Sequence, residues 1–226
     1  MHKLLVVCPT RQRTERCKVM YESAKETALV SDFIFCVDED DPCIGQYISF
    51  FEWNKIDFMI SPRKTTTELF NNTFILYPNY EFYCLTNDDF VFRTPGWDET
   101  LCQKGKICYG NDLLGGQALP TCPVIDGDLV RALGWLQMPG ISYMYGDTVW
   151  KMIGEKLKNL KYFPDVIIEH CHWMNHKAEI DDVYKTTNSA RVYESDEKAY
   201  RKWRIEEMEK DLEKIRNQIA QIPANR

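Results

Sequence analysis

The sequence lacks both common glycine-rich phosphate-binding motifs. Neither G-x-G-x-x-G nor G-x-x-x-x-G-K-[ST] occurs in its 226 residues, so neither a dinucleotide-binding fingerprint nor a P-loop is supported. No run approaches the ~20 apolar residues that a membrane-spanning helix needs, and we expect no membrane partner. The apolar stretch at residues 4–7 ends at Pro9 and is too short for a signal peptide. A cytoplasmic protein is therefore expected.

The nine cysteines form no C-x-x-C pair, and their number is odd. Cys8, Cys36 and Cys84 each lie inside an apolar run, where reduced cysteine behaves as a small hydrophobic residue. This pattern favours a reducing compartment over a disulfide framework. The missing cysteine pairs also argue against structural zinc.

Net charge is the next constraint. The formal value is -6, which gives no global attraction to nucleic acid or to an anionic membrane, although a local basic groove would be compatible with it. A hydrophobic content of 44% and a charged content of 27% describe an ordinary globular protein. The length allows one sizeable α/β domain or two very small ones.

Alternating strand and helix patterns predict an α/β fold. Helical patterns at residues 14–29 and 65–76 separate short apolar runs, and this spacing predicts parallel strands with right-handed crossovers. A further helix is expected at 147–157, and the Gly- and Pro-rich segment 94–140 is expected to be mostly loop. The expected strands lie at residues 4–7, 33–37, 58–60, 80–86 and 165–172. We therefore predict a mixed, mainly parallel sheet flanked by helices.

A charged amphipathic helix is expected from Ser195 onward, which divides the chain into a domain at 1–194 and an extension at 195–226. Apolar residues in the extension recur at spacings of three and four, the pattern of a coiled-coil seam. Two interpretations remain open: a homodimer contact, and a strap across the domain's own surface. The stripe comprises Ile205, Met208, Leu212, Ile215, Ile219 and Ile222.

The segment Asn87-Asp88-Asp89 carries the strongest chemical signal. It follows an apolar run, so in a parallel sheet its acids would lie at the carboxyl edge, where open α/β sheets bind ligands. Paired carboxylates suit a divalent cation that bridges to phosphate oxygens. The alternative is a simple turn between two strands, because Asn and Asp are common turn residues.

Polar side chains follow the other expected strands as well. Arginine and lysine can clamp phosphates, while carboxylates can bind a ribose hydroxyl, a base edge or a metal. Each cluster alone could be an ordinary solvated loop. Their coincidence at strand ends favours a nucleotide diphosphate site. These residues are Thr10, Arg11, Arg13, Asp38, Arg63 and Lys64.

Two histidines and one aspartate complete the candidate site. His170 and His172 would share one face of a strand, so either could join Asp89 at a metal, or both could be packing residues. Asp147 is the best candidate for a general base, and its alternative role is a helix N-cap. Asp112 and Glu155 are weaker base candidates.

Large aromatic residues could also contribute. Trp97, Trp135, Trp150 and Trp173 could form a platform under a sugar ring, although such side chains are more often core.

These motifs together resemble the GT-A glycosyltransferases. The resemblance covers most of residues 1–185, and the part containing Lys177, Asp181, Asp182 and Tyr184 is similar to small phage-type members. It is carried by residues 7–13, 37–40, 87–89, 96–98, 146–147 and 169–172.

The resemblance implies a metal-dependent hexosyl- or pentosyltransferase with a nucleotide-sugar donor, a UDP-sugar first among the candidates. Asp89, next to Asp88, and either histidine would hold Mn²⁺ or Mg²⁺. Thr10, Arg11 and Asp38 would border the nucleoside. Asp147 would match the base of inverting members.

One residue departs from the family pattern. Asn87 stands where the family often has its first acid, so it can accept a hydrogen bond from ribose but brings no charge. The acceptor could be a glycan, a small molecule, a protein or a hydroxylated DNA base.

Two other functions compete with this hypothesis. A sugar-1-phosphate nucleotidyltransferase would share the crevice and the metal, but it should carry a glycine-rich loop where residues 9–13 contain none. A catalytically silent nucleotide-binding or assembly module, dominated by the C-terminal helix, is the alternative from a different class.

Overall fold

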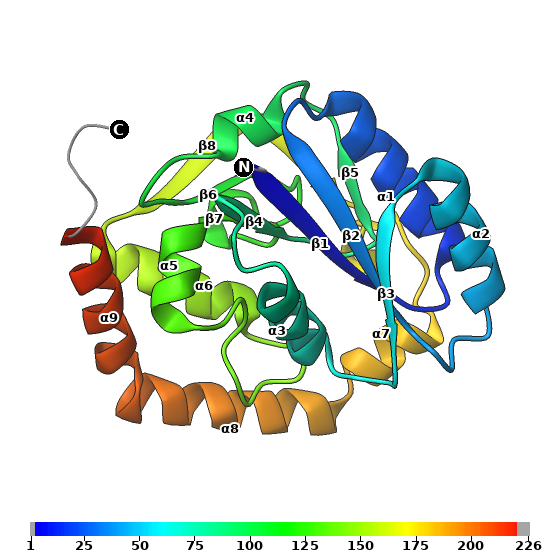
Figure 1. Cartoon of the computed structure of the whole chain (residues 1–226). Helices are drawn as coiled ribbons and strands as arrows, with labels where there is room; N and C mark the ends of the chain where they lie inside the picture. Colours follow the sequence, from blue (N-terminus) through cyan, green and yellow to red (C-terminus); the bar gives the residue numbers. More distant parts are fainter. Residues whose placement is uncertain (1–2, 221–226) are drawn as a thin grey trace.

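A computed structural model describes residues 3–220 (Figure 1). Within these residues, no helix is long and apolar enough to cross a membrane. The strands are β1 (Leu4–Thr10), β2 (Ser31–Asp38), β3 (Asp57–Ser61), β4 (Phe82–Leu85), β5 (Phe90–Phe92), β6 (Ile107–Asn111), β7 (Val124–Asp126) and β8 (Leu160–His170). The α-helices are α1 (Thr14–Thr27), α2 (Ile44–Asn54), α3 (Thr66–Leu76), α4 (Trp97–Leu101), α5 (Gly127–Leu133), α6 (Gly146–Leu157), α7 (Asp182–Thr187), α8 (Ala190–Glu206) and α9 (Met208–Ala220). Two 3-10 turns, η1 (Gly116–Ala118) and η2 (Trp173–Asn175), complete the described elements.

The strands form one mixed sheet in the order β3-β2-β1-β4-β7-β6-β8-β5. Strands β3, β2, β1 and β4 are parallel neighbours, and β6 is parallel to β8. The pairs β4–β7, β6–β7 and β5–β8 are antiparallel. The predicted mixed, mainly parallel sheet flanked by helices is confirmed.

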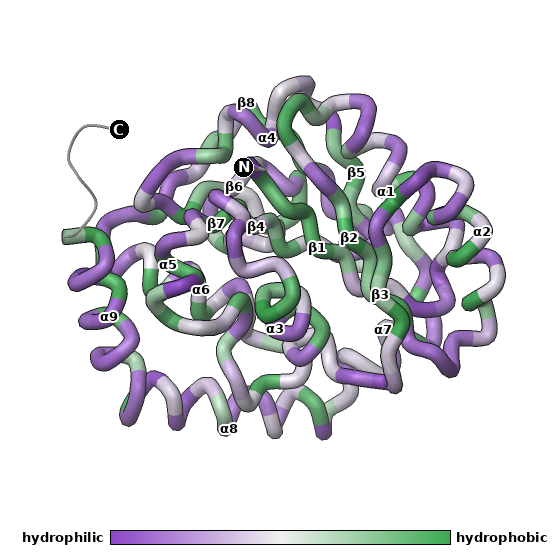
Figure 2. The backbone as a smooth tube through the Cα atoms, in the orientation of Figure 1, coloured by the Kyte–Doolittle hydropathy of each residue, from purple (hydrophilic) through white to green (hydrophobic). Residues whose placement is uncertain are grey.

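Helices cover both faces of the sheet (Figure 1). Along β1, Leu4, Val6 and Cys8 pack into the core shared with α1, α2 and α4, while Leu5 and Val7 pack into the core shared with α3, α5 and α6. Because side chains alternate along a strand, a sheet covered on both faces needs apolar residues at every position. This requirement explains the unbroken apolar runs in the sequence, and Figure 2 shows them as hydrophobic strands inside polar outer helices.

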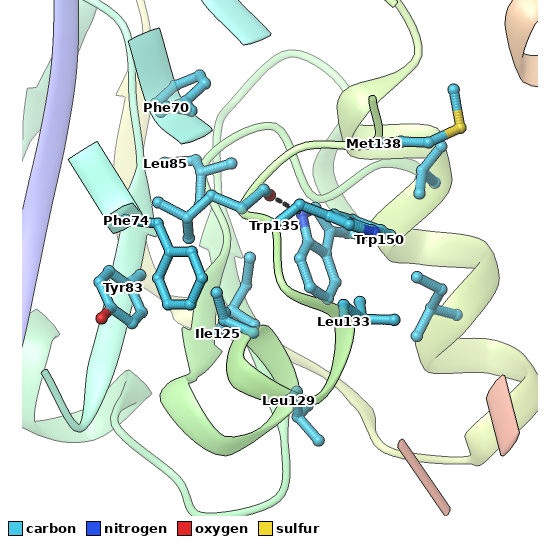
Figure 3. Close-up of a cluster of buried hydrophobic side chains, with 14 of the residues drawn as sticks. Phe70, Phe74, Tyr83, Leu85, Ile125, Leu129, Leu133, Trp135, Met138 and Trp150 are labelled. Atoms are coloured by element: carbon cyan, nitrogen blue, oxygen red, sulfur yellow. Dashed lines mark hydrogen bonds between the residues drawn. The ribbon is translucent and has the colours of Figure 1, made fainter. Parts of the chain in front are cut away.

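The tryptophans are mostly core residues. Trp97, Trp135 and Trp150 are buried, and the Trp150 indole donates a hydrogen bond to the carbonyl oxygen of Leu136 at 2.8 Å (Figure 3). The predicted sugar platform is therefore wrong for these three residues, because large aromatic rings contribute most when fully buried. Of the four candidates, Trp173 is 39% exposed.

The C-terminal helix begins earlier than the composition indicated. The expected start is Ser195, but α8 begins at Ala190 and is followed after Glu207 by a separate helix, α9. Figure 1 shows α8 running along the lower side of the molecule and α9 turning upward beside α5. The break interrupts the continuous seam that the spacing predicted.

The apolar stripe of this region packs on the chain itself. Leu212 and Ile215 are fully buried in the core that contains α5 and α6, whereas Ile205 is 79% exposed. Ile222 lies outside the described residues. The central stripe residues therefore form a strap across the domain's own surface, and these two side chains are unavailable to a partner.

One carboxylate ties α8 to the loop that precedes α6. Asp196 is fully buried, and its two oxygens accept hydrogen bonds from the backbone N–H groups of Ser142, Tyr143 and Met144, each at 2.8 Å. Buried backbone N–H groups need such partners. The loop leading to Asp147 is thus held in place by the C-terminal helix.

We expect Asp196→Asn to lower the free energy of unfolding by about 2–4 kcal/mol, because an amide nitrogen replaces one acceptor and leaves buried N–H groups unpaired. Urea denaturation followed by circular dichroism measures this change. Glu194→Gln is the matched control, since Glu194 is exposed on the same helix. Equal stability of the two variants would contradict the role given to Asp196.

Candidate active site

Every residue predicted to bind the donor lies on one cavity of about 620 Å³. It opens at the carboxyl ends of β1, β2 and β4, the edge where open α/β sheets bind ligands. Residues of α7 and of the loop before α6 form the opposite wall. The predicted residues that line it are Thr10, Arg11, Arg13, Asp38, Arg63, Lys64, Asn87 and Asp88.

At one end of the cavity, the Arg11 guanidinium is paired with two carboxylates. Its Nη1 donates to Asp38 Oδ2 at 3.0 Å and to Asp40 Oδ1 at 2.6 Å. The other oxygen of Asp38 accepts a hydrogen bond from the backbone of Lys64 at 3.4 Å. These contacts join the ends of β1, β2 and β3 into one rigid rim.

Arg63 and Lys64 differ from Arg11 and Arg13 because their side chains carry charge that is not paired. Among residues 3–220, neither side chain makes a salt bridge or a hydrogen bond, whereas Arg11 and Arg13 are both paired with aspartates. Both residues line the cavity. Arg63 and Lys64 are therefore the cations available to an anionic ligand there.

Asp88 holds the floor of the cavity together. Its Oδ2 accepts from the Thr10 hydroxyl at 2.8 Å, and its Oδ1 accepts from Arg13 Nη1 at 3.2 Å. Burial raises the pKa of the Asp88 carboxyl to about 6, against the opposing influence of Arg13. Through these hydrogen bonds Asp88 has a structural role, in addition to lining the cavity.

Asp89 and His170 lie side by side because β5 pairs with β8. The register places Phe90 opposite His170, and His170 Nε2 lies 3.5 Å from Asp89 Oδ2. The His170 ring stacks on Phe90, with 4.4 Å between ring centroids. Burial raises the pKa of the Asp89 carboxyl, but His170 and the Tyr184 hydroxyl outweigh it, and the pKa falls below its usual range.

His172 is less suited to bind a metal than His170. Its Nδ1 accepts a hydrogen bond from the backbone N–H of Met174 at 3.3 Å. Burial and the neighbouring His170 also lower the pKa of His172. A nitrogen that already accepts a hydrogen bond has its lone pair engaged and does not offer it to a cation.

Asp89 and His170 fit a divalent cation that also binds phosphate. Within residues 3–220, Asp89 Oδ1 and His170 Nδ1 are buried and have no hydrogen-bond partner. The same residues contain no group of three or more His, Cys, Asp or Glu side chains that could hold a metal ion. A cation of this kind typically takes one or two protein ligands and completes its shell with phosphate oxygens and water.

Asp147 does not line the cavity. It occupies the first turn of α6, and its Oδ1 accepts from the backbone N–H of Thr148 at 2.6 Å. Burial raises the pKa of the Asp147 carboxyl, while Thr148 and the charge of His170 oppose the rise. A raised pKa makes a carboxylate a better proton acceptor.

The carboxylates of the weaker base candidates are engaged or remote, although the carbonyl oxygen of Asp112 accepts a hydrogen bond from the backbone N–H of His170 at 2.9 Å. Asp112 Oδ1 accepts from the backbone N–H groups of Leu114, Gly115 and Gly116, which fixes a tight loop. Glu155 is exposed near the far end of α6.

Residues after position 140 complete the cavity, and strand-end reasoning did not select them as site residues. Tyr143 lines it from the loop before α6, and Val192 lines it from α8. The wall formed by α7 is held by Asp181, which binds Arg13 from 168 positions away in the sequence. The resemblance to phage-type members drew attention to Asp181 and Tyr184, but no local pattern indicated their partners.

Comparison with known proteins identifies the architecture. No protein-family model matches the chain, and no curated protein does so either. Solved structures do resemble it. S. aureus TarS 1-349 in complex with UDP superposes with a TM-score of 0.56 and 11% identity, over 74% of this chain and 59% of that one. The mannosyltransferase PcManGT from Pyrobaculum calidifontis, in complex with GDP-Man and Mn2+, gives 0.57 and 9%, over 96% and 74%.

The fold is that of a GT-A-like glycosyltransferase. The expected GT-A architecture is thereby confirmed. The chain spans 59% of the TarS fragment, so that protein contains parts with no counterpart here. At 9–12% identity the likeness concerns the fold, and the activity is argued below from this chain's own residues.

The two unpaired cations should set the affinity of this GT-A-like site for a diphosphate. We expect the double substitution Arg63→Ala/Lys64→Ala to weaken pyrophosphate binding about tenfold or more, because two charge-assisted contacts are lost. Isothermal titration calorimetry measures the affinity. Lys156→Ala/Lys198→Ala, at exposed positions on α6 and α8, changes the net charge equally. A similar loss in both variants would mean that only net charge attracts the anion.

Proposed function

We propose that the chain is a metal-dependent glycosyltransferase, which moves a sugar from a nucleotide diphosphate to an acceptor hydroxyl. The main support is one cavity that is lined by all the predicted donor-binding residues, among them Asp88, the neighbour in sequence of Asp89, which lies 3.5 Å from His170. TarS in complex with UDP and PcManGT in complex with GDP-Man and Mn2+ support the same class of donor.

The donor would lie along the carboxyl edge of the sheet. Arg63 and Lys64 would bind the diphosphate, since their charges are not paired within the described residues. Asp38, held by Arg11, would border the nucleoside. Among residues 3–220 the Asn87 side chain has no hydrogen-bond partner, and it lines the cavity. Its amide would accept or donate to the ribose.

Asp89 and His170 would hold the cation. Asp89 Oδ1 is the buried oxygen without a partner, and His170 is preferred to His172 because a backbone N–H already binds His172 Nδ1. When bound, Mn²⁺ or Mg²⁺ neutralises the charge that develops on the leaving diphosphate. The protein supplies two fixed ligands and an environment with little water.

Asp147 would act as the general base. Its carboxylate lies on the first turn of α6, near His170, with a pKa raised by burial. It would take the proton of the acceptor hydroxyl as that oxygen attacks the anomeric carbon. A single displacement of this kind inverts the configuration at that carbon.

We propose that residues 1–194 form the catalytic domain and that the extension at 195–226, whose first residues lie within α8, braces it. Asp196 supports this division of labour, because it lies just inside the extension and holds the loop that carries Tyr143 to the cavity wall.

The donor should stabilise the folded chain only when its nucleotide matches the cavity. At a concentration 100 times its dissociation constant, a ligand of the native state adds about 2.7 kcal/mol. We expect one of the UDP-, GDP- or CMP-linked sugars to raise the melting temperature, and Mn²⁺ to enlarge the shift. Asp89→Asn should abolish the contribution of Mn²⁺ and keep part of the nucleotide's effect. A shift that is identical in this variant would contradict the metal assignment.

Removing the proposed base should slow transfer without weakening donor binding. We expect Asp147→Asn to lower kcat by about 10²–10⁴-fold, the usual contribution of general-base catalysis, with an unchanged donor dissociation constant. Release of nucleotide diphosphate in the presence of an acceptor gives the rate. Glu155→Gln on the same helix is the control and should keep full activity. Binding of donor without transfer or hydrolysis by the wild type would instead favour a silent nucleotide-binding module.

A further inference from the structure

Tyr184 of α7 contacts the proposed metal ligand directly. Its side chain is 2% exposed, and its hydroxyl donates a hydrogen bond to Asp89 Oδ2 at 2.5 Å. The two residues are 95 positions apart in the sequence. Because Oδ2 accepts this hydrogen bond, Oδ1 is left as the buried oxygen with no partner among residues 3–220.

The Tyr184 side chain is held between Arg13 and His172. The guanidinium of Arg13 lies over the ring, 4.1 Å from its centroid, and the ring of His172 meets it edge-on at 5.2 Å. Asp181 Oδ1 accepts the backbone N–H of Tyr184 at 2.9 Å and so caps α7. The phenol therefore has little freedom to turn away from Asp89.

Arg13 connects this arrangement to the aspartate pair. Its Nε and Nη2 bind the two oxygens of Asp181 at 2.8 Å each, and its Nη1 binds Asp88 at 3.2 Å. A fork-shaped guanidinium with two parallel bonds to one carboxylate is a geometry that lysine cannot reproduce. Three of its N–H groups are thus engaged by aspartates of the chain itself.

We propose that Tyr184 is a positioning residue, which acts through Asp89 to set the affinity of the site for its divalent cation, and that Arg13 holds Tyr184 in place instead of clamping a phosphate. The inference rests on the proposed metal-dependent function. Hydrogen bonds to a ligating carboxylate fix its orientation, and losing such a partner typically costs about 10–100-fold in metal affinity.

The hydroxyl could have the opposite effect, and the direction of the change distinguishes the two. If Tyr184 orients Asp89, removing the hydroxyl weakens cation binding. If the hydroxyl competes with the cation for the carboxylate, removing it strengthens binding.

The deciding experiment is a titration of the full chain with Mn²⁺, in which electron paramagnetic resonance detects the free ion. We expect Tyr184→Phe to raise the Mn²⁺ dissociation constant about tenfold, with the melting temperature of the Mn²⁺-free protein close to that of the wild type. Tyr77→Phe is the control, because the Tyr77 side chain makes no hydrogen bond within residues 3–220. Unchanged or tighter binding by Tyr184→Phe would overturn the proposal.

A second pair of variants tests Arg13 separately. We expect Arg13→Gln and Arg13→Lys both to weaken Mn²⁺ binding, and Arg13→Gln combined with Tyr184→Phe to cost less than the sum of the two, since they act through one contact. If Arg13 clamps a phosphate instead, these variants lose affinity for UDP measured without metal and keep that for Mn²⁺. If the wild-type protein binds no Mn²⁺, the proposed metal-dependent function is wrong as well. If the wild type binds Mn²⁺ normally and the variants bind it equally well, only the positioning role is wrong.

Discussion

The antiparallel pairing of β5 with β8 is the constraint on which the candidate site depends. Phe90 lies opposite His170 in this pair, and that register places a carboxylate and an imidazole from distant parts of the chain 3.5 Å apart. A shift by one residue would turn His170 to the other face of the sheet. The stacking of Phe90 on His170 and the buried neighbours of β5 favour the observed register.

Much of the fold could be predicted because the buried strands are apolar on both faces. The elements that escaped prediction carry weaker patterns. Helix α2 buries only Tyr47 and Phe51 and leaves Trp53 87% exposed, so its apolar residues do not mark one face. Strand β7 has three residues and pairs antiparallel on both sides, which no local signal distinguishes from a turn within a segment rich in glycine and proline.

The residues that line the cavity could be predicted together because topology alone brings the carboxyl ends of parallel strands to one edge. The ion pairs that these charged side chains form with one another could not be predicted. Arg13 and Arg63 are equivalent in the sequence, both following a strand, yet Arg13 is paired with Asp88 and Asp181, while Arg63 makes no salt bridge with the described residues. The difference depends on Asp181 at the start of α7. No strand pattern marks that part of the sequence, so strand-end reasoning does not select it.

The bonds of Asp196 have a consequence for the order in which the molecule matures during synthesis. A nascent chain that has emerged as far as α6 already contains the paired strands β1 to β4, whose ends border the cavity. The backbone N–H groups of Ser142, Tyr143 and Met144, however, have no acceptor until α8 leaves the ribosome. The strands β3, β2, β1, β4, β7 and β6 can therefore pair before α8 is made, whereas the loop that carries Tyr143 to the cavity wall gains its acceptor only once α8 is in place.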